Sequence, residues 1–352
     1  GKPAKVVNET EAKSIEDSLK QGNFSVSVID ERMAKRNPGA PFTTSTIQQE
    51  VSVKLVFSLK ITMVVAQQLY EGNFNIPDYS GGLITYMRTD SVVLAEQALT
   101  QAQEVISAEY GIKFGLKEPR KFKNRTANAQ EAHEAIRPTD FARKPSDMKM
   151  LDKDQMRLYD LIWKRTLASQ MESALIDQVG VNIGVDGKST IVRATGSTIA
   201  FDGFLKVYLE GTDDEDDDEQ SGLLPKVTVG DILPVEEITA TQRYTRPAPR
   251  YTEASLVKRL EELGIGRPST YAPTISTVQK RGYVVKDDIE GKTRKYELLS
   301  LKNDVIKVET FSENYGADKN KMHPSDIGKV VTEFLVEHFA DIMDYGFTAS
   351  VE

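Results

Sequence analysis

A tyrosine two positions before an arginine, Tyr86 and Arg88, is the feature of this sequence best suited to chemistry on phosphate. If the surrounding stretch is extended, side chains alternate between its faces, so both project to the same side. A free phenol titrates near pH ~10 and is a weak nucleophile at neutral pH. A neighbouring guanidinium favours the phenolate and pairs with phosphate oxygens as negative charge develops. The pair therefore predicts attack on a phosphate, although such pairs are more often packing or surface residues.

His133 and Arg137 form a second candidate group. The pair His133-Glu134 is typical of a zinc-binding helix, but that motif needs a second histidine where Arg137 stands. The chain also has no cysteine to complete a ligand set, so we expect no metal site here. If this segment is helical, the histidine and the arginine lie one turn apart and face a phosphate together.

The turn at residues 264–270 is a third candidate, for contact with nucleic acid. Ser269 and Thr270 precede a predicted helix, whose free N–H groups and dipole favour a phosphate. The same two residues could serve as helix caps. Arg267 adds a phosphate clamp, and Tyr271 offers a ring on which an unpaired base could stack.

Two apparent nucleotide motifs do not meet their requirements. The Gly-Lys-Ser-Thr run at 187–190 lacks the glycine that a phosphate-binding loop needs five residues earlier, where Asn182 stands. The Gly-Ile-Gly-Arg-Pro-Ser run at 264–269 follows a predicted helix rather than a strand and ends in serine, unlike a dinucleotide-binding turn. We therefore expect no role for ATP.

The composition is that of a globular protein without membrane or disulfide features. The chain has 352 residues, enough for two or three domains, with 39% hydrophobic and 28% charged residues. No apolar run reaches a membrane-spanning length, and no secretory signal opens the chain. Zero cysteines exclude disulfides and thiolate metal sites, as expected for a cytoplasmic protein. The opening Gly1 and an ending in mid-pattern at Glu352 predict a piece of a longer protein.

The net charge of −8 arises from one local run of acids. Residues 213–219 are all Asp or Glu, and such a run predicts a solvated loop. Outside this run the acidic and basic residues nearly balance. A near-neutral body can still carry a basic groove, so the charge does not exclude nucleic acid as a partner.

Hydrophobic periodicity predicts helical regions that alternate with a β region. Period-two patterns predict a strand over 24–29 and a hairpin that turns at Asp186-Gly187. The predicted helices of the first helical region are one ending near Leu55 with Ser45 or Thr46 as its N-cap, one over 60–71, one beginning at Ser91, and one over 154–171 around a core Trp163. From residue 253, two helices joined by a turn and a hairpin wing at 283–286 and 293–298 are typical of DNA-binding domains.

Three separated motifs, in the same order along the chain, resemble those of bacterial type IA DNA topoisomerases. Residues 84–91, Ile-Thr-Tyr-Met-Arg-Thr-Asp-Ser, are similar to the family's nucleophile motif, and residues 131–138 are similar to its histidine motif. Residues 253–258 together with 264–271 are similar to its single-strand-binding motif. Shorter stretches at 41–46 and 347–349 also fit, so the resemblance covers nearly the whole chain.

The resemblance implies a multidomain α+β fold with the family's toroidal, arch-shaped architecture. The implied domains are 1–36 as the first part of a β arch, 37–171 as a helical nucleophile domain with Tyr86, 172–245 as the second part of the arch, and 246–352 as a helical base domain with a winged-helix-like single-strand-binding segment. The helical nucleophile domain would thus be inserted into the β arch.

The resemblance also implies an ATP-independent isomerase that relaxes negative supercoils by cutting and rejoining one DNA strand. Tyr86 would attack a backbone phosphate, forming a 5′-phosphotyrosine and releasing a 3′-hydroxyl. Arg88 would hold the scissile phosphate, and His133 would assist by proton transfer or by orienting its neighbours. The residues implied to bind DNA are Arg137, Ser255, Lys258, Arg267, Ser269, Thr270, Tyr271 and Arg281. The implied partner of this monomer is single-stranded or negatively supercoiled DNA, with no membrane association.

Two parts of the family's proteins are not found in this sequence. The Mg²⁺-binding toprim domain would precede it, and the zinc ribbons would follow it. Mg²⁺ is therefore expected to act in the full-length enzyme through the toprim domain, with none bound by this segment. We expect the segment alone to bind single-stranded DNA weakly without relaxing supercoils. Residues 73–80 also look like an insertion before the nucleophile motif.

Three other classes of protein compete with this interpretation. A winged-helix regulator would explain 251–298 but leaves Tyr86, Arg88 and His133 without a role. A tyrosine recombinase would use a tyrosine and an arginine, but its tyrosine usually lies near the end of the chain. A non-catalytic DNA-binding scaffold would describe the segment if it acts without the rest of the enzyme.

Overall fold

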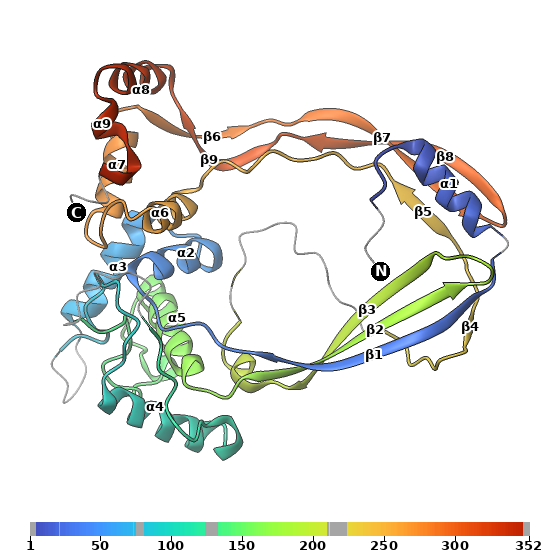
Figure 1. The fold of residues 1–352 in the computed structure, drawn as a ribbon. Helices are drawn as coiled ribbons and strands as arrows, with labels where there is room; N and C mark the ends of the chain where they lie inside the picture. Colours follow the sequence, from blue (N-terminus) through green and yellow to red (C-terminus); the bar gives the residue numbers. More distant parts are fainter. Residues whose placement is uncertain are drawn as a thin grey trace.

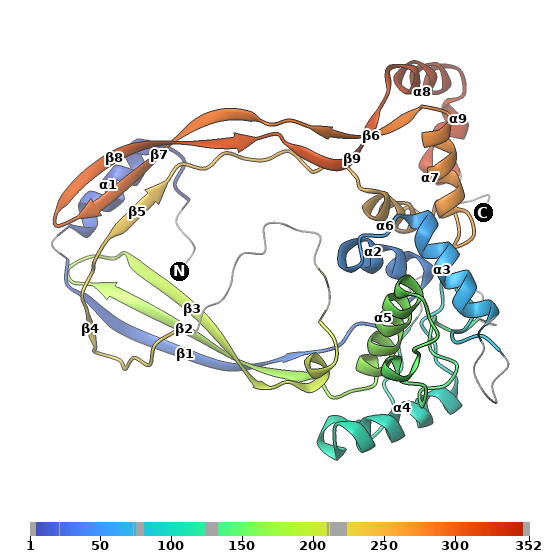
Figure 2. The same ribbon diagram turned by 180° about the vertical axis from the view of Figure 1, so that it is seen from behind.

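In the computed structural model a helical body carries two β arms, which meet again at their far ends and close the chain into a ring (Figure 1, Figure 2). The structure describes residues 5–20, 22–72, 74, 81–123, 133–209, 211 and 224–347. The predictions for 213–219, for 73–80 except Phe74, and for 131–132 and 348–349 lie outside these residues. The ring of helices and antiparallel sheets confirms the predicted arch-like α+β fold.

Four helices surround the main hydrophobic core of the body. They are α2 (Thr44–Lys54), α3 (Leu59–Glu71), α4 (Glu96–Glu109) and α5 (Lys153–Ser169). Trp163 of α5 is buried in this core, as predicted, and its indole N–H donates to the Phe141 carbonyl at 3.2 Å. Short 3-10 turns at Ile112–Phe114, Pro145–Asp147 and Gly203–Lys206 connect these elements.

Two helix starts differ from the predictions. The N-cap of α2 is Thr43 rather than Ser45 or Thr46, because Thr43 and Thr46 exchange backbone and side-chain hydrogen bonds as a capping box. The helix predicted to begin at Ser91 is α4, which begins at Glu96. The chain before it is held extended, since the Ala135 N–H donates to the Val93 carbonyl at 2.8 Å.

The first arm is a four-stranded antiparallel sheet in the order β3-β2-β1-β4. Its strands are β1 (Phe24–Arg36), β2 (Ala174–Val185), β3 (Ile191–Phe201) and β4 (Ile232–Leu233). β1 pairs with β2 from Phe24 opposite Val185 to Arg36 opposite Ala174, so segments on either side of the helical body share one sheet. The predicted hairpin joins β2 to β3, where Gly187 has the positive φ of 68° that favours glycine in a turn.

The second arm is built on a long antiparallel hairpin and corrects the predicted wing. Its strands are β5 (Ile238–Thr241), β6 (Val284–Ile289), β7 (Lys292–Lys302), β8 (Val305–Tyr315) and β9 (Asp318–Pro324). β6 pairs with β9 and β7 with β8, so β6 and β7 are not the two strands of a wing hairpin. The reversal lies at Asn303-Asp304, where φ is 49° and 60° as a two-residue type I′ turn requires. The helical character predicted for 246–352 therefore holds for only part of that range.

The two arms meet at a far junction, where the chain passes from β4 in the first sheet to β5 in the second. The junction is covered by α1 (Glu9–Leu19), for which no helix was predicted from the sequence (Figure 1). Asn8 caps α1, and Leu19 packs with Phe24 and Val185 in a small core. This apolar contact closes the ring at the end opposite the helical body.

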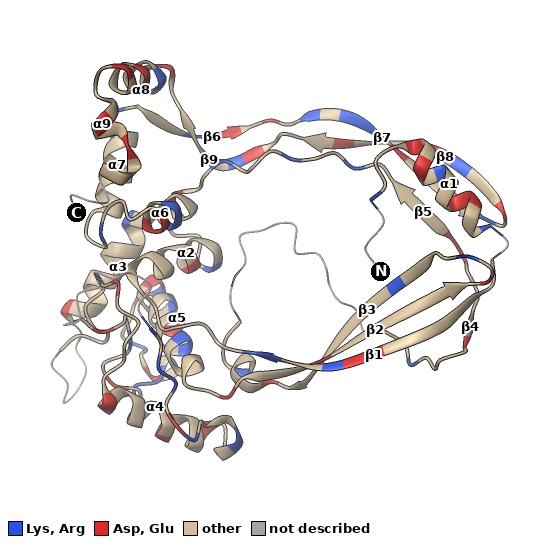
Figure 3. Cartoon of the chain, in the orientation of Figure 1, with Lys and Arg blue, Asp and Glu red and all other residues tan. Residues whose placement is uncertain are grey.

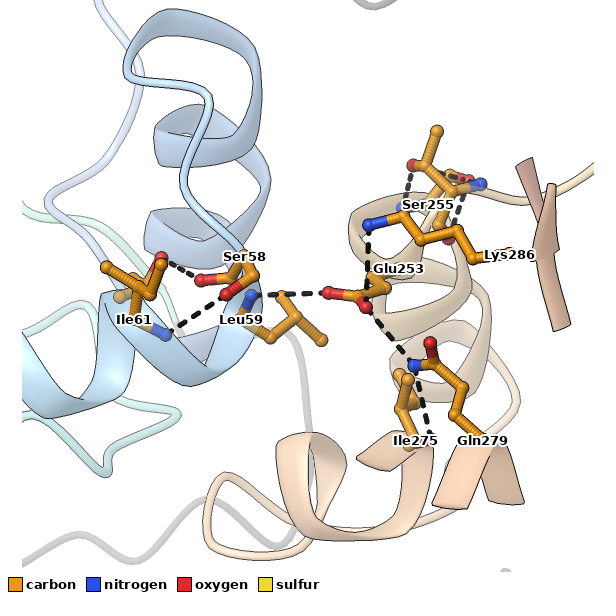
Figure 4. Close-up of polar contacts among 10 residues, drawn as sticks. Ser58, Leu59, Ile61, Glu253, Ser255, Ile275, Gln279 and Lys286 are labelled. Atoms are coloured by element: carbon orange, nitrogen blue, oxygen red, sulfur yellow. Dashed lines mark hydrogen bonds and ion pairs between the residues drawn. The ribbon is translucent and has the colours of Figure 1, made fainter. Parts of the chain in front are cut away.

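A near junction closes the ring on the side of the helical body, where α2 and α3 meet α6 (Glu253–Glu262) and α7 (Tyr271–Lys280). The members of its small core are Leu59, Val257, Tyr271, Ile275 and Met322. Glu253 connects the two sides: it accepts from the Leu59 N–H at 3.3 Å and from the Gln279 amide at 3.1 Å, and it pairs with Lys286 at 3.6 Å (Figure 4). One carboxylate thus links the start of α3 to the neighbouring α6, α7 and β6.

The described chain ends with α8 (Asp326–His338) and α9 (Ala340–Met343). Lys, Arg, Asp and Glu are interspersed over the helices and along both arms (Figure 3). Within the described part of the chain, no helix combines the length and the apolar character needed to cross a membrane.

Candidate active site

The segment that contains Tyr86 is extended but is not a regular strand. Its ladder contact is a single bridge between Ile84 and Pro138. Backbone hydrogen bonds hold it on two sides: the Leu83 N–H donates to the Leu69 carbonyl at 2.8 Å, and the Thr85 N–H donates to the Arg137 carbonyl at 2.9 Å. These bonds fix the segment between the end of α3 and the segment that follows His133.

The side chains of this segment alternate as predicted only from Tyr86 to Thr89. Tyr86 and Arg88 are exposed and Met87 and Thr89 are buried, whereas the preceding Leu83 and Ile84 are both buried. The buried side chains anchor the backbone in the main core, and the two side chains able to act on phosphate remain accessible.

The first turn of α2 holds the backbone on either side of Arg88. The Thr44 hydroxyl donates to the Met87 carbonyl at 2.7 Å and accepts from the Thr89 N–H at 2.9 Å. The Thr44 N–H donates to the Thr89 carbonyl at 2.9 Å. Thr44 is fully buried, so Arg88 projects from a backbone held by hydrogen bonds that water does not reach.

Two rings contact the Tyr86 ring. The His133 ring lies with its centroid 5.9 Å away at an interplanar angle of 69°, and the Tyr70 ring lies 5.4 Å away at 66°. Both contacts have the edge-to-face geometry that aromatic pairs prefer. Tyr86 is 38% exposed, so its ring is accessible to solvent although two neighbouring rings contact it. The structure therefore brings together Tyr86 and His133, as predicted.

The segment from His133 to Thr139 is not helical, which corrects the expectation for Arg137. Ile136 bridges Phe42 and Pro138 bridges Ile84, so this segment is extended. The Arg137 side chain is 12% exposed and pairs with Glu134 at 2.5 Å, and it also donates to the Pro138 carbonyl at 2.9 Å. Because these partners occupy the guanidinium, Arg137 supports the fold beside the site rather than offering a free charge to DNA.

A groove of about 620 Å³ runs beside the Tyr86 segment and connects the two sides of the near junction. Its lining residues are Lys60, Met63, Val64, Gln67 and Gln68 of α3, Arg88, Pro268 and Ser269 of the turn, and Ala272, Pro273 and Ser276 of α7. The lining contains two cations and no acid, so this chain carries a basic groove although its net charge is −8. Arg88 and Ser269, both predicted from the sequence, thus face one space.

The turn before α7 uses some of its predicted DNA ligands internally. The Thr270 hydroxyl accepts from the Arg267 N–H at 2.8 Å, and the Arg267 side chain donates to the Gly266 carbonyl at 3.0 Å. Tyr271 is 6% exposed and lies in the small core of the near junction, so its predicted role as a stacking platform is wrong. The reason is its place as the first residue of α7, on the side that packs against α6. Ser269 remains exposed at the groove.

The other predicted DNA ligands lie outside this groove. Ser255 is half-buried and forms the capping box of α6 with Thr252, bonding to its N–H at 2.8 Å. Lys258 and Arg281 are exposed cations on the same side of the near junction, but neither lines the groove. These positions can add general attraction for a phosphate backbone.

Sequence reasoning missed the contribution of α3. Lys60, Val64 and Gln67 line the groove, and Tyr70 touches Tyr86 one turn further on. Their spacing of three and four residues places them along one helix face, which is a signal that the sequence carries. It was not used because a mixed polar and apolar face resembles an ordinary solvent-exposed surface.

Comparisons with known proteins identify the family to which this chain is similar. A family model described as DNA topoisomerase matches residues 1–297. DNA topoisomerase 1 of Rickettsia bellii is 44% identical over 348 residues, which are 99% of this chain and 39% of the relative. DNA topoisomerase 1 of Xylella fastidiosa strain Temecula1 is 42% identical over 335 residues, 94% of this chain and 37% of the relative. Full-length topoisomerase I from Thermotoga maritima has a similar structure, with a TM-score of 0.74 at 31% identity over 99% of this chain and 50% of that one. The chain thus spans about two fifths of the length of these curated relatives.

Proposed function

This chain belongs to the bacterial type IA DNA topoisomerase family, and from that premise we propose that it supplies the tyrosine with which such an enzyme cuts and rejoins one DNA strand. The proposed activity is relaxation of negative supercoils without ATP. The substrate is DNA with a single-stranded stretch that can enter the groove beside Tyr86. We further propose that the enzyme acts as a monomer in the cytoplasm.

The proposed reaction is a transesterification at a backbone phosphate. The Tyr86 phenol oxygen forms a bond to phosphorus, while the bond from phosphorus to the 3′ oxygen of the neighbouring sugar breaks. The phenolic proton is lost, and the 3′ oxygen gains a proton and leaves as a hydroxyl. One phosphate ester replaces another, so the released 3′-hydroxyl can attack the 5′-phosphotyrosine and reseal the strand without a nucleotide.

The exposed guanidinium of Arg88 is proposed to hold the scissile phosphate. It lines the groove two residues after Tyr86, and its backbone is held by hydrogen bonds to Thr44. A guanidinium pairs with two phosphate oxygens at once, and it stabilises the charge that builds on them during attack.

His133 is proposed to assist at the Tyr86 ring, which its own ring contacts edge-on. A histidine titrates near neutral pH and can accept or donate a proton there. The contact also orients the phenol. Proton transfer and orientation predict different pH profiles for a His133→Phe variant, because only a proton-transfer role makes the cleavage rate depend on imidazole ionisation.

The observation that carries the proposal is the accessible Tyr86 ring against His133, beside a basic groove lined by Arg88 and Ser269. The test is Tyr86→Phe in a full-length enzyme that contains this chain. The variant should form no covalent adduct with a single-stranded oligonucleotide, while its affinity for that oligonucleotide changes less than about 2-fold, because only the hydroxyl is lost. Adducts that persist in this variant would show that another residue is the nucleophile.

Among the described residues, no group of three or more His, Cys, Asp or Glu is placed to hold a metal ion. We propose that the Mg²⁺ expected for the full-length enzyme is held by parts of the enzyme outside this chain. On that basis this chain alone should bind single-stranded DNA without relaxing a supercoiled plasmid. Robust Mg²⁺-dependent relaxation by the purified chain would refute this part of the proposal.

The structure gives no support to a winged-helix regulator as the alternative. That interpretation needs a wing hairpin directly after α7, but β6 pairs with β9 and continues into the long second arm. It also leaves the contact between Tyr86 and His133 without a role.

A further inference from the structure

Tyr70, to which no function has yet been assigned, makes the shorter of the two ring contacts on Tyr86. It lies in the last turn of α3, with its ring centroid 5.4 Å from that of Tyr86 at an interplanar angle of 66°. Tyr70 is 39% exposed, close to the 38% of Tyr86. The two rings therefore form an accessible edge-to-face pair instead of a buried packing contact.

Backbone contacts hold the two segments that carry these rings close together. The Leu83 N–H donates to the Leu69 carbonyl at 2.8 Å, which ties the end of α3 to the Tyr86 segment. A Cβ on Gly82 would lie 1.9 Å from the Tyr70 carbonyl oxygen, so only glycine allows this approach. Gly72 ends α3 with a φ of 74°, and a Cβ there would lie 1.9 Å from the Gly81 carbonyl oxygen. Two glycine contacts thus seat the Tyr86 segment directly on the end of the helix that carries Tyr70.

We propose that Tyr70 is a positioning residue for the nucleophile: its ring, set by the end of α3, fixes the orientation of the Tyr86 ring on one side while His133 contacts it on another. This inference rests on the proposed role of Tyr86. A half-exposed phenol has a broad preference about its terminal side-chain torsion, so lateral contacts decide where its oxygen points. Small errors in the position of an attacking atom slow a reaction strongly.

The ring of Tyr70, rather than its hydroxyl, carries this role. The contact of Tyr70 with Tyr86 is an edge-to-face contact between the two rings. Phenylalanine should therefore substitute for Tyr70, and a residue without a ring should not. A role in strand binding by stacking would predict a different result, namely a loss of affinity at an unchanged rate of cleavage.

The experiment measures single-turnover formation of the covalent adduct on an end-labelled single-stranded oligonucleotide, with the full-length enzyme and over a range of strand concentrations. Tyr70→Leu should lower the maximal rate about 3- to 10-fold, the range expected for an aromatic pair, and should leave the half-saturating concentration within about 2-fold. Tyr70→Phe should cleave at the wild-type rate. Tyr315→Leu is the matched control, because Tyr315 is also 39% exposed but lies on β8 of the second arm.

Three outcomes overturn the inference: a full cleavage rate in Tyr70→Leu, a loss confined to strand affinity, or a slow Tyr70→Phe variant. Tyr70→Gln is a second ring deletion suited to a half-exposed helix end, and thermal unfolding of each variant shows whether it is folded. Tyr86→Phe is measured in parallel. If Tyr86→Phe still forms adducts, the proposed function fails; if it forms none and Tyr70→Leu cleaves normally, only the role of Tyr70 fails.

Discussion

Two cations, Arg88 and Lys60, line the groove beside the Tyr86 segment, and they differ in how they can bind a phosphate. The guanidinium of Arg88 is a planar fork for two oxygens, whereas the ammonium of Lys60 is a single point charge. Arg88→Ala should therefore slow adduct formation about 100- to 1000-fold, and Arg88→Lys should recover only part of this loss. Strand affinity should fall far less than the rate. Single-turnover cleavage in the full-length enzyme, with a parallel binding titration, measures both.

Lys60→Ala is the matched control for this prediction. Lys60 lines the same groove from α3. Its removal should weaken binding, mostly at low salt, and leave the cleavage rate at saturating strand unchanged. Equal losses of rate in the Lys60 and Arg88 variants would mean that the groove needs positive charge in general and that Arg88 has no special place at the phosphate.

Substitutions at Tyr271 and Ser269 distinguish an effect on stability from an effect on DNA binding at the start of α7. Tyr271 is buried in the near-junction core, so Tyr271→Ala should cost about 3 kcal/mol of unfolding free energy in a denaturant titration. Tyr271→Phe should leave affinity for a single strand unchanged. Ser269 is exposed at the groove, so Ser269→Ala should weaken that affinity by about 5-fold, the value of one hydrogen bond, without loss of stability. A large loss of affinity in a stable Tyr271→Phe variant would restore the stacking role that its burial argues against.

The outward direction of Tyr86 and Arg88 could be predicted from the sequence because alternation along an extended segment is a local property. The roles of Arg137 and Tyr271 could not. Whether a guanidinium is free depends on a partner such as Glu134, and whether a ring is buried depends on which helix packs over it. Those partners are set by tertiary contacts, which the residue types alone do not specify.

At the scale of elements, the far junction contains a carboxylate in an unfavourable place. Glu16 of α1 is 2% exposed, and neither of its carboxyl oxygens has a hydrogen-bond partner among the residues that the structure describes. Burial is the largest cause that raises the pKa of this carboxyl. A carboxyl whose pKa is higher in the folded state favours folding at low pH, and this contribution is lost as the pH rises through the raised value.

Glu16→Gln should therefore stabilise the docking of α1 at pH 7, and the gain should shrink as the pH falls toward ~4, where the free carboxyl is protonated. Hydrogen exchange of the α1 amides in the variant and the wild type, measured across this pH range, follows the difference. Glu9→Gln is the control on the same helix, since Glu9 is exposed and pairs with Lys13. If the two variants protect α1 equally at pH 7, burial of the Glu16 charge is not what limits the docking.

The sequence predicts the elements more reliably than their pairing. The period of apolar residues located α3, α5, α6 and α7 to within a residue or two, because each buries one face in a core. The pairing of β6 with β9 was missed, since the turn that decides it, Asn303-Asp304, has no glycine. The sequence pattern of β6 and β7 therefore resembles that of a wing hairpin, although the chain reverses direction only after β7, between β7 and β8.

At the scale of the whole molecule, the ring was predicted through resemblance alone. Neither of its two closures can be predicted from periodicity, because each depends on which elements pack together. The far one depends on α1 and the short strands β4 and β5, and the near one on the small core around Leu59 and on the Glu253 carboxylate. The groove at Arg88 depends on the near closure, because α3 lines one side of it and α7 the other. Opening of the near junction would therefore separate the two sides of the groove.

Glu253 is expected to control how often the near junction opens. It is the first residue of α6 and also accepts from the N–H of Leu59, the first residue of α3, so one carboxylate lies at the N-termini of two helices. Helix dipoles favour a negative charge at both positions, and Gln279 and Lys286 add a hydrogen bond and an ion pair (Figure 4). Its side chain is 16% exposed, which limits screening by solvent. Glu253→Ala should therefore weaken the near junction by about 2 kcal/mol.

Hydrogen exchange of the chain can measure this change at each junction separately. In Glu253→Ala the amides of the first turn of α3 should exchange about 30-fold faster, the factor that corresponds to ~2 kcal/mol, while those of β4 and β5 at the far junction keep their rates. Glu262→Gln is the control, because Glu262 lies on the same helix and pairs only at the surface, with Arg259 at 3.2 Å. Equal exchange in the two variants would mean that the apolar contact of Leu59 holds the near junction without the carboxylate. Faster exchange at both junctions would mean that the ring opens as one cooperative unit, and the two closures could then not open independently.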